Sequence, residues 1–248
     1  MFRWTARHLA SVLLSCLMLG APTAGASSFT PEQRAEIIGI LREALRSDPS
    51  ILREALEALQ TSYRTRQDEA AHAAIALKRD SLLADPADPV AGNPAGDVTV
   101  VEFYDTRCPY CRRMLPTLAA LLKAEPGIRL VYKDLPVLGP TSQIEARALL
   151  AAQRQGGYLR MQEALMQAVA PSTPESIRVE AERQGLDGLR LLQDMNDPAI
   201  RTRLTTNMML ARDLNIGGTP AMVIGGRLIP GAMELAELRA AIQEARAR

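Results

Sequence analysis

The sequence predicts an α/β domain that is split by a helical insertion and preceded by a helical arm. Strand-like runs at 98–104 and 128–132 flank a helix-like run at 112–123. Two short strand-like runs and a last helix-like run follow only after a long block of helical segments. This order of strand–helix–strand, helical block and strand–strand–helix is typical of an α/β fold with helices inserted in its middle.

The first 26 residues have the features of a secretory signal peptide. Arg3 and Arg7 make a basic start, 9–19 is an uncharged apolar run, and 24–26 offers a small-residue cleavage site. The apolar run is too short to span a bilayer comfortably. A lipoprotein signal acylated at Cys16 is the alternative. We therefore expect the protein to be exported to the periplasm.

Residues 27–84 are predicted to form the helical arm. Thr30 and Gln33 surround Pro31 in a capping-box pattern, which predicts that a helix starts there. Further along, apolar residues recur at spacings of four, three and four: Leu52, Leu56, Leu59 and Tyr63. This short seam predicts one of two arrangements: a helix packed on its own domain, or a homo-oligomer formed through residues 30–63.

A linker rich in proline, glycine and aspartate is predicted at 85–97, and the α/β domain at 98–248. The helical insertion covers about 142–214. Gly225-Gly226 predicts a hairpin between strands at 221–224 and 227–230, and the chain closes with a helix at 234–246. The formal net charge is +1, which argues against nucleic acid as a partner.

Cys108 and Cys111 form the motif that carries the predicted chemistry. Cleavage of the signal would remove Cys16 and leave this single pair of the three cysteines, and two closely spaced thiols stabilise a fold little. Cys108 falls where a strand meets a helix N-terminus, a place that favours a thiolate. We expect Cys108 to face solvent as the nucleophile and Cys111 to be shielded and to resolve the mixed disulfide. An inert disulfide and a Cu(I) site are the alternatives.

Residues around the pair have predicted supporting roles. Pro109 and Tyr110, between the thiols, are expected to contact substrate, and no histidine there adds positive charge. Glu102 lies in a strand that otherwise reads as buried, so it is expected to hold a proton and to exchange it with Cys111. The alternative is a pair between Glu102 and Lys133 on the neighbouring strand. After signal cleavage His72 is the one remaining histidine, so the sequence predicts no zinc site.

Thr219-Pro220 precedes a predicted strand and follows two glycines. An X–Pro bond can be cis at modest cost. A cis proline here would expose backbone beside the thiols, ready to bind an extended peptide. An ordinary turn is the alternative.

These residues resemble the DsbA-like thioredoxin-fold family of exported thiol–disulfide oxidoreductases. The resemblance extends from Val90 to the C-terminus and is most specific at 92–105, at the CPYC motif and at Thr219-Pro220. It implies a thioredoxin fold with inserted helices and no cofactor. It also implies that Cys108 attacks, Cys111 resolves, Glu102 is the buried acid and Thr219-Pro220 is the cis-proline loop.

Within the family, the helical arm is similar to that of ScsC- and Com1-type members. Some relatives of that kind oligomerise through such an arm and act as isomerases, and Tyr110 and Thr219 resemble the isomerase choice. Thr106-Arg107 departs from the residues that many members carry before the first cysteine. Arg107 is expected to place positive charge beside the thiolate.

The sequence leaves three functions open. The favoured one is an isomerase or reductase that acts on exported, cysteine-containing clients and is kept reduced by a DsbD- or ScsB-like membrane partner. The second is a DsbA-like oxidase that is reoxidised by a DsbB-like membrane enzyme. The third is a non-catalytic copper-binding or holdase protein.

Overall fold

The computed structural model describes residues 29–247. The predicted signal peptide at 1–26 and the alternative acylation site at Cys16 lie outside the described residues. The chain divides after Leu59 into two compact units, which are described separately below.

The first unit contains helix α1 (Pro31–Ser47) and the beginning of helix α2 (Ser50–Leu77). The predicted capping box is present: Gln33 N donates to Thr30 Oγ1 at 3.3 Å, and Thr30 N donates to Gln33 Oε1 at 2.9 Å. No residue of α1 is buried. The apolar side chains of α1 and the seam are exposed, among them Ile37, Ile38, Leu41, Leu52, Leu56, Leu59 and Tyr63.

The second unit begins inside α2, so the division differs from the predicted arm at 27–84. Ile75, near the end of α2, is buried in a core cluster with residues of the sheet. The next helix, α3 (Arg79–Leu83), adds Leu82, which is fully buried in the same cluster. Residues 60–84 therefore contribute to the core of the α/β unit.

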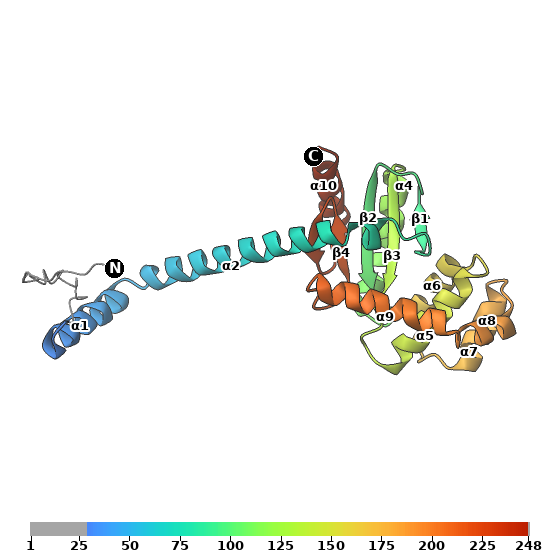
Figure 1. Cartoon of the computed structure of the whole chain (residues 1–248), viewed down its shortest axis with the longest axis horizontal. Helices are drawn as coiled ribbons and strands as arrows, with labels where there is room; N and C mark the ends of the chain where they lie inside the picture. Colours follow the sequence, from blue (N-terminus) through green and yellow to red (C-terminus); the bar gives the residue numbers. More distant parts are fainter. Residues whose placement is uncertain (1–28, 248) are drawn as a thin grey trace, which may run out of the picture. The chain divides into compact units, whose positions relative to one another are not determined.

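The unit is built on a five-stranded sheet with the order β1-β3-β2-β4-β5 (Figure 1). The strands are β1 (Val90–Gly92), β2 (Val98–Tyr104), β3 (Ile128–Asp134), β4 (Ala221–Ile224) and β5 (Arg227–Pro230). Strands β2 and β3 are parallel, and the other pairs are antiparallel. The predicted α/β class is confirmed. Strand β1 corrects the linker prediction, because residues 90–92 within 85–97 pair with β3.

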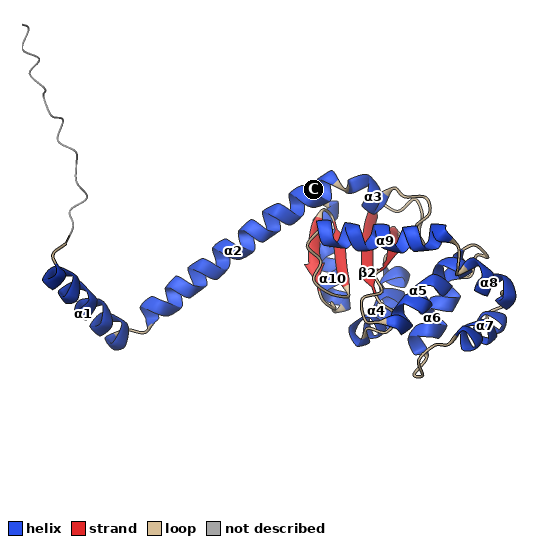
Figure 2. Cartoon of the chain, turned by 60° about the horizontal axis from the view of Figure 1, so that its bottom comes forward, coloured by secondary structure: helices blue, strands red, loops and turns tan. Residues whose placement is uncertain are grey.

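Alternation along β2 assigns its side chains to two cores. Val98, Val100 and Tyr104 face the core that contains helix α4 (Pro109–Ala124) and helix α10 (Leu235–Arg246). Val101 and Phe103 face the core that contains the ends of α2 and α3 and part of helix α9 (Pro198–Asp213). Figure 2 shows α9 crossing the sheet. The sheet therefore lies between two helical layers.

Helices α5 to α8 occupy the predicted helical block and gather at one end of the sheet (Figure 1). They are α5 (Pro140–Gln153), α6 (Tyr158–Gln167), α7 (Pro174–Arg183) and α8 (Gly188–Asp194). Helix α9 connects this insertion with the sheet: Ile200 and Leu204 belong to the core cluster shared with the insertion, and Leu210 and Ala211 belong to the cluster on the sheet face.

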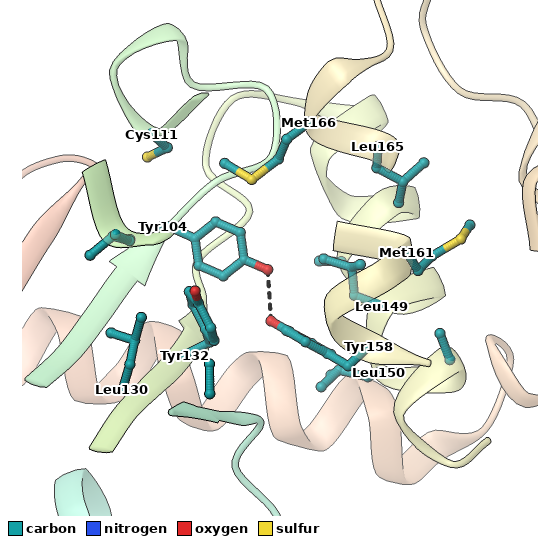
Figure 3. Packing of buried hydrophobic residues seen from close by; sticks show 14 of the residues in the cluster. Tyr104, Cys111, Leu130, Tyr132, Leu149, Leu150, Tyr158, Met161, Leu165 and Met166 are labelled. Carbon is teal, nitrogen blue, oxygen red and sulfur yellow. Dashed lines mark hydrogen bonds between the residues drawn. The ribbon is translucent and has the colours of Figure 1, made fainter. Parts of the chain in front are cut away.

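A buried triangle of oxygens joins the sheet to the insertion. The hydroxyls of Tyr104 in β2 and Tyr158 in α6 lie 2.7 Å apart (Figure 3). The Tyr104 hydroxyl also lies 3.0 Å from Asp134 Oδ1 of β3, and the Tyr158 hydroxyl lies 2.9 Å from Asp134 Oδ2. Burial raises the pKa of Asp134 to about 7. Three oxygen–oxygen contacts need three hydrogens, and two hydroxyls supply two. A protonated carboxyl supplies the third.

A second buried network anchors the segment before β1. Lys133 Nζ, on β3, donates to Asp88 Oδ2 at 2.6 Å and to the Ser81 carbonyl at 2.7 Å. Arg203 of α9 bridges Asp85 and Asp88. Lys133 and Asp88 are both buried. The predicted linker is thus fixed at its beginning to both β3 and α9. Within residues 29–247 every helix is too short or too polar to span a lipid bilayer.

Candidate active site

The two thiols lie where β2 passes into α4, as the sequence predicts. Cys108 is the N-cap of α4, and Pro109 is the first helical residue. The Cys108 carbonyl accepts from Arg112 N at 3.0 Å, and Cys108 N donates to the Asp105 carbonyl at 3.0 Å. Proline suits this first position because its missing N–H would have no helical partner. The sulfur of Cys108 is thereby held at the positive end of the α4 dipole.

Cys108 is more buried than predicted. Its exposed fraction is 4%, so the expectation that it faces solvent is wrong for this state. The cause is the loop before β4: the Cys108 thiol donates to the Thr219 carbonyl, with Sγ and O 3.1 Å apart. The nucleophile is therefore covered by the backbone of the loop that is expected to bind clients.

Cys111 is shielded one turn further into α4, with 1% of its surface exposed. Burial raises its pKa far above the usual thiol range. The charges of Glu102 and Cys108 raise it further, while a backbone hydrogen bond at Asp105 opposes them. Cys111 thus needs a proton acceptor before it can attack a disulfide.

The Thr219–Pro220 peptide bond is cis, which confirms that prediction. The bond immediately precedes β4, which pairs antiparallel with β2. The Pro220 carbonyl accepts from Gly231 N at 2.9 Å, just after β5. Pairing of β4 with both neighbours therefore places the Thr219 carbonyl beside the first cysteine.

Glu102 is buried under α4, with 2% of its surface exposed. It follows the parity of Val100 and Tyr104 along β2, so it points toward the same core as Cys111. Its backbone neighbours are Tyr132 on β3 and Met222 on β4. Burial raises its pKa to about 8. Among the described residues its Oε1 has no hydrogen-bond partner.

The alternative pairing of Glu102 with Lys133 is wrong. Lys133 lies on the opposite face of β3, where it binds Asp88. The register explains this. Glu102 is aligned with Tyr132 of β3, and successive side chains of a strand point to opposite faces, so Lys133 points to the face opposite Glu102.

Pro109 and Tyr110 are exposed, whereas the two thiols on either side of them are buried. The Tyr110 side chain is 55% exposed, and the Arg113 guanidinium lies 4.4 Å from the centre of its ring. A hollow of about 770 Å³ adjoins this ring and the cis bond. Its lining comes from α4, the cis loop and the segment after β5: Tyr110, Arg113, Met114, Thr219, Pro220, Met233 and others.

Asp105 is a site residue that the sequence analysis missed. Its Oδ1 accepts from Arg107 N at 2.8 Å, and its Oδ2 accepts from Val137 N at 2.9 Å and Leu138 N at 3.0 Å. Aspartate often accepts a hydrogen bond from the backbone N–H two residues further on in a turn, and this preference could have predicted the contact between Asp105 and Arg107 N. The contacts across to 137–138 have no signal in the sequence.

Arg107 is bound by the helical insertion. Its guanidinium donates to the carbonyls of Ala168, Val169 and Ala170 at 3.2–3.3 Å. The effect of its charge on the neighbouring Cys108 thiolate stays a prediction. Among the described residues no three His, Cys, Asp or Glu side chains cluster in a way that could hold a metal ion.

Comparisons with known proteins agree with this geometry. A family model described as DSBA-like thioredoxin domain matches residues 99–243. A thioredoxin-like oxidoreductase from Silicibacter pomeroyi DSS-3 is 43% identical, with 68% of this chain and 98% of that chain covered and a TM-score of 0.66. ScsC from Proteus mirabilis is 30% identical, covering 88% of this chain and 99% of that one, with a TM-score of 0.66.

A periplasmic thioredoxin-like protein from Salmonella enterica serovar Typhimurium is 33% identical, covering 69% of this chain and 97% of that chain, with a TM-score of 0.63. Among curated proteins, the chain is 32% identical over 166 residues to the Na(+)/H(+) antiporter NhaA 1 of Salinispora arenicola and spans 26% of its length. It is 25% identical over 181 residues to the thiol:disulfide interchange protein DsbA of Burkholderia cepacia, covering 79% of that protein.

The matched residues include both thiols, the buried glutamate and the cis-proline loop, and they lie on the sheet and helices described above. This chain belongs to the DSBA-like thioredoxin domain family of thiol–disulfide oxidoreductases, and its α/β unit is a thioredoxin fold.

Proposed function

We propose that the protein exchanges disulfides with exported, cysteine-containing client proteins and that it works mainly as an isomerase or reductase. The observation that carries the proposal is the position of Cys108, at the N-terminus of α4 and 3.1 Å from the Thr219 carbonyl at the cis bond. A helix N-terminus favours the thiolate, and an exposed strand end binds extended peptide.

The first step joins the client to Cys108. The Cys108 thiolate attacks one sulfur of a client disulfide, a new disulfide forms, and the other client sulfur leaves as a thiolate. Once Cys108 has no S–H, the Thr219 carbonyl loses its hydrogen-bond donor. That carbonyl is then free to accept a backbone N–H of the client, which holds the extended segment in register.

The second step releases the client. Glu102 takes the proton of Cys111, and the Cys111 thiolate attacks Cys108 Sγ and expels the client sulfur. The client is then reduced and the pair is oxidised. In isomerisation a different client thiolate attacks the client sulfur that is bonded to Cys108, so a new client disulfide forms and Cys108 leaves as a thiolate without the use of Cys111. Both routes conserve electrons, and only the first needs a membrane reductase of the DsbD or ScsB type to restore the dithiol.

The arm supports isomerisation over oxidation. An isomerase must hold misfolded clients while disulfides rearrange, and α1 and α2 expose a row of apolar side chains that suits self-association. The likeness to ScsC covers 88% of this chain, and so it extends into the arm. We propose that copies of the chain assemble through residues 30–63 and enclose a shared client surface.

Scrambled ribonuclease tests this function. The reduced protein should restore ribonuclease activity faster than a small-molecule thiol buffer at the same thiol concentration, and Cys108→Ser should not. Restoration no faster than the buffer would reject isomerisation.

An oxidase is the second candidate. The α4 N-terminus beside Cys108 favours the reduced form of the pair, which is the property of a disulfide donor. Alkylation trapping in cells discriminates: a mostly reduced resting pair supports the isomerase, and a mostly oxidised pair supports an oxidase served by a DsbB-like partner.

The periplasm is the proposed location. It rests on the signal-like residues 1–26 and on the likeness to a periplasmic thioredoxin-like protein. Mass spectrometry of the mature N-terminus checks it, since cleavage after residue 26 and acylation at Cys16 give different masses.

A further inference from the structure

Glu145 of α5 is a fully buried carboxylate that contacts the segment just before Cys108. Its exposed fraction is 0%. Its Oε2 accepts from Thr106 Oγ1 at 2.5 Å, and its Oε1 accepts from Ser172 Oγ at 2.6 Å. Thr106 lies two residues before the nucleophile, and Ser172 lies between α6 and α7. One carboxylate thus ties the active-site loop to the helical insertion.

Arg107 completes this connection from the other side. Its Nη1 lies 3.7 Å from Glu145 Oε1, and its guanidinium also binds three successive carbonyls at 168–170. Only 20% of the Arg107 side chain is exposed. The residue next to Cys108 is therefore fixed by an ion pair and by the segment that follows α6.

A second arginine shares the same surroundings. Arg112, in the first turn of α4, donates from Nε to the Thr106 carbonyl at 2.8 Å. Burial and the charge of Arg107 lower the pKa of Arg112, and the charge of Glu145 opposes them. Glu145, Arg107 and Arg112 therefore form one group of interacting charges around the segment just before Cys108.

A buried charge is costly unless its partners compensate for it, and this one is compensated entirely by the active-site loop and the insertion. We propose that Glu145 is a positioning residue: it holds residues 106–107 against the insertion and offsets the charge of Arg107 and Arg112, and so it sets the redox poise of the Cys108–Cys111 pair. This inference rests on the proposed exchange activity and adds a residue that does not touch the reacting sulfurs.

The sign of the effect follows from the charges. Removing the carboxylate leaves two arginines with less opposing charge close to the loop that carries Cys108. Positive charge stabilises a thiolate, and a stabilised thiolate favours the reduced form. Glu145→Gln should therefore make the pair a stronger oxidant.

The experiment measures the equilibrium of the full-length protein with reduced and oxidised glutathione, with the thiols trapped by alkylation. Glu145→Gln should raise the equilibrium constant for reduction by about three- to tenfold, where tenfold corresponds to about 30 mV for this two-electron couple. Arg107→Gln should shift the constant in the opposite direction. The double variant should return close to the wild-type value, because it restores the charge difference.

Two controls separate charge from structure. Glu163→Gln removes an exposed carboxylate from α6 of the same insertion and should leave the constant unchanged. Thr106→Val removes a hydrogen bond to Glu145 but keeps the charge of Glu145. It should therefore lower the thermal stability and leave the equilibrium constant with glutathione nearly unchanged. An equal shift from Thr106→Val would overturn the charge argument.

The outcomes also separate this inference from the proposed function. A wild-type protein whose thiols do not equilibrate with glutathione would reject the exchange activity itself. A wild-type protein that equilibrates normally, with Glu145→Gln and Arg107→Gln both within about twofold of it, would reject only the role of Glu145. Should Glu145→Gln fail to fold, the opposite shift expected for Arg107→Gln still decides the question.

Discussion

At the scale of single residues, the two cysteines are distinguished by depth and by their neighbours. Cys108 occupies a helix N-terminus against a loop carbonyl, and Cys111 lies beside a buried glutamate. This asymmetry supports the proposed roles, in which Cys108 attacks and Cys111 resolves, because a thiol with a strongly raised pKa is a poor resting nucleophile.

Replacing each cysteine in turn should separate the two steps. The wild-type protein should accelerate the reduction of insulin by a thiol buffer, and Cys108→Ser should abolish this acceleration. Cys111→Ser should keep the attack but trap mixed disulfides, since the resolving sulfur is missing. Non-reducing electrophoresis shows these adducts. Undiminished turnover by Cys108→Ser would contradict the assignment.

Glu102→Gln should change the pH dependence of resolution. The carboxyl has a pKa of about 8, so its ionised, proton-accepting form becomes available as the pH rises through that value. Resolution of the mixed disulfide should therefore speed up between about pH 7 and 9 in the wild type. The variant should lose this rise and be about tenfold slower or more at pH 9.

Stopped-flow release of a fluorescent peptide from Cys108 measures this rate. Glu163→Gln, which removes a carboxylate exposed on α6, is the matched control and should keep the wild-type profile. A Glu102→Gln profile that rises as steeply as that of the wild type would remove Glu102 from the proton transfer.

At the scale of elements, strand β2 and helix α4 were the most predictable parts of the chain. The strand has the predicted bounds, and the helix begins at Pro109 and ends at Ala124, against a predicted run at 112–123. Their signals are local: a run of β-branched and aromatic residues, then a proline at a helix start. Strand β1 was missed because its three residues follow a proline and end in a glycine, and three residues are too few to show a periodicity.

Contacts between distant elements could not be predicted from the sequence. Arg107 meets backbone carbonyls about sixty positions away, and a carbonyl carries no sequence signal. The Tyr104–Asp134–Tyr158 triangle likewise needs three elements to be packed before its oxygens meet. Glu102 was predictable in its burial, since it interrupts an apolar strand, whereas the partner of Lys133 depended on the register.

The triangle gives a pH-dependent stability. The pKa of Asp134 is raised to about 7 in the folded protein, above its ordinary value of 3.8, so the folded state binds the proton more tightly. Stability from this group is complete at low pH and is lost as pH rises from about 4 to about 7. The side chain of the Asp134→Asn variant cannot ionise. The free energy of unfolding should therefore fall by about 1–3 kcal/mol less in this variant than in the wild type as the pH rises over that range.

Urea unfolding at pH 5 and pH 8 measures the difference. Glu102 has a raised pKa as well and contributes to the same trend in both proteins. Comparing Asp134→Asn with wild type therefore isolates the triangle. Equal pH dependence in the two proteins would show that Asp134 is already ionised across this range.

At the scale of the whole molecule, the division after Leu59 separates the arm from a unit with its own core. Ile75 and Leu82 contribute to that core, so a truncation at residue 84 would remove part of it. Removal of residues 27–59 should leave thermal stability nearly unchanged, retain reduction of a small disulfide, and lose the reactivation of scrambled ribonuclease.

Light scattering of the same truncated protein should give the mass of one chain, and the full-length protein a multiple of it. Leu52→Asp with Leu56→Asp should reproduce the truncation, because a charge on the exposed seam opposes packing of apolar side chains. Glu57→Ala, between the seam positions, should assemble normally. A monomeric full-length protein would reject assembly through the arm.

The edges of the sheet bear on the proposed exchange with unfolded clients. Strand β1 covers the outer side of β3 with three residues, and β5 on the other margin has four residues, with Arg227 at its beginning and Pro230 at its end. Short edge strands, and a charged residue or a proline on such a strand, disfavour hydrogen-bonded pairing with the extended backbone of another chain. We therefore expect the extended segments of the proposed clients to pair poorly with either edge of the sheet, so that the cis-proline loop beside Cys108 stays the preferred place for them to bind.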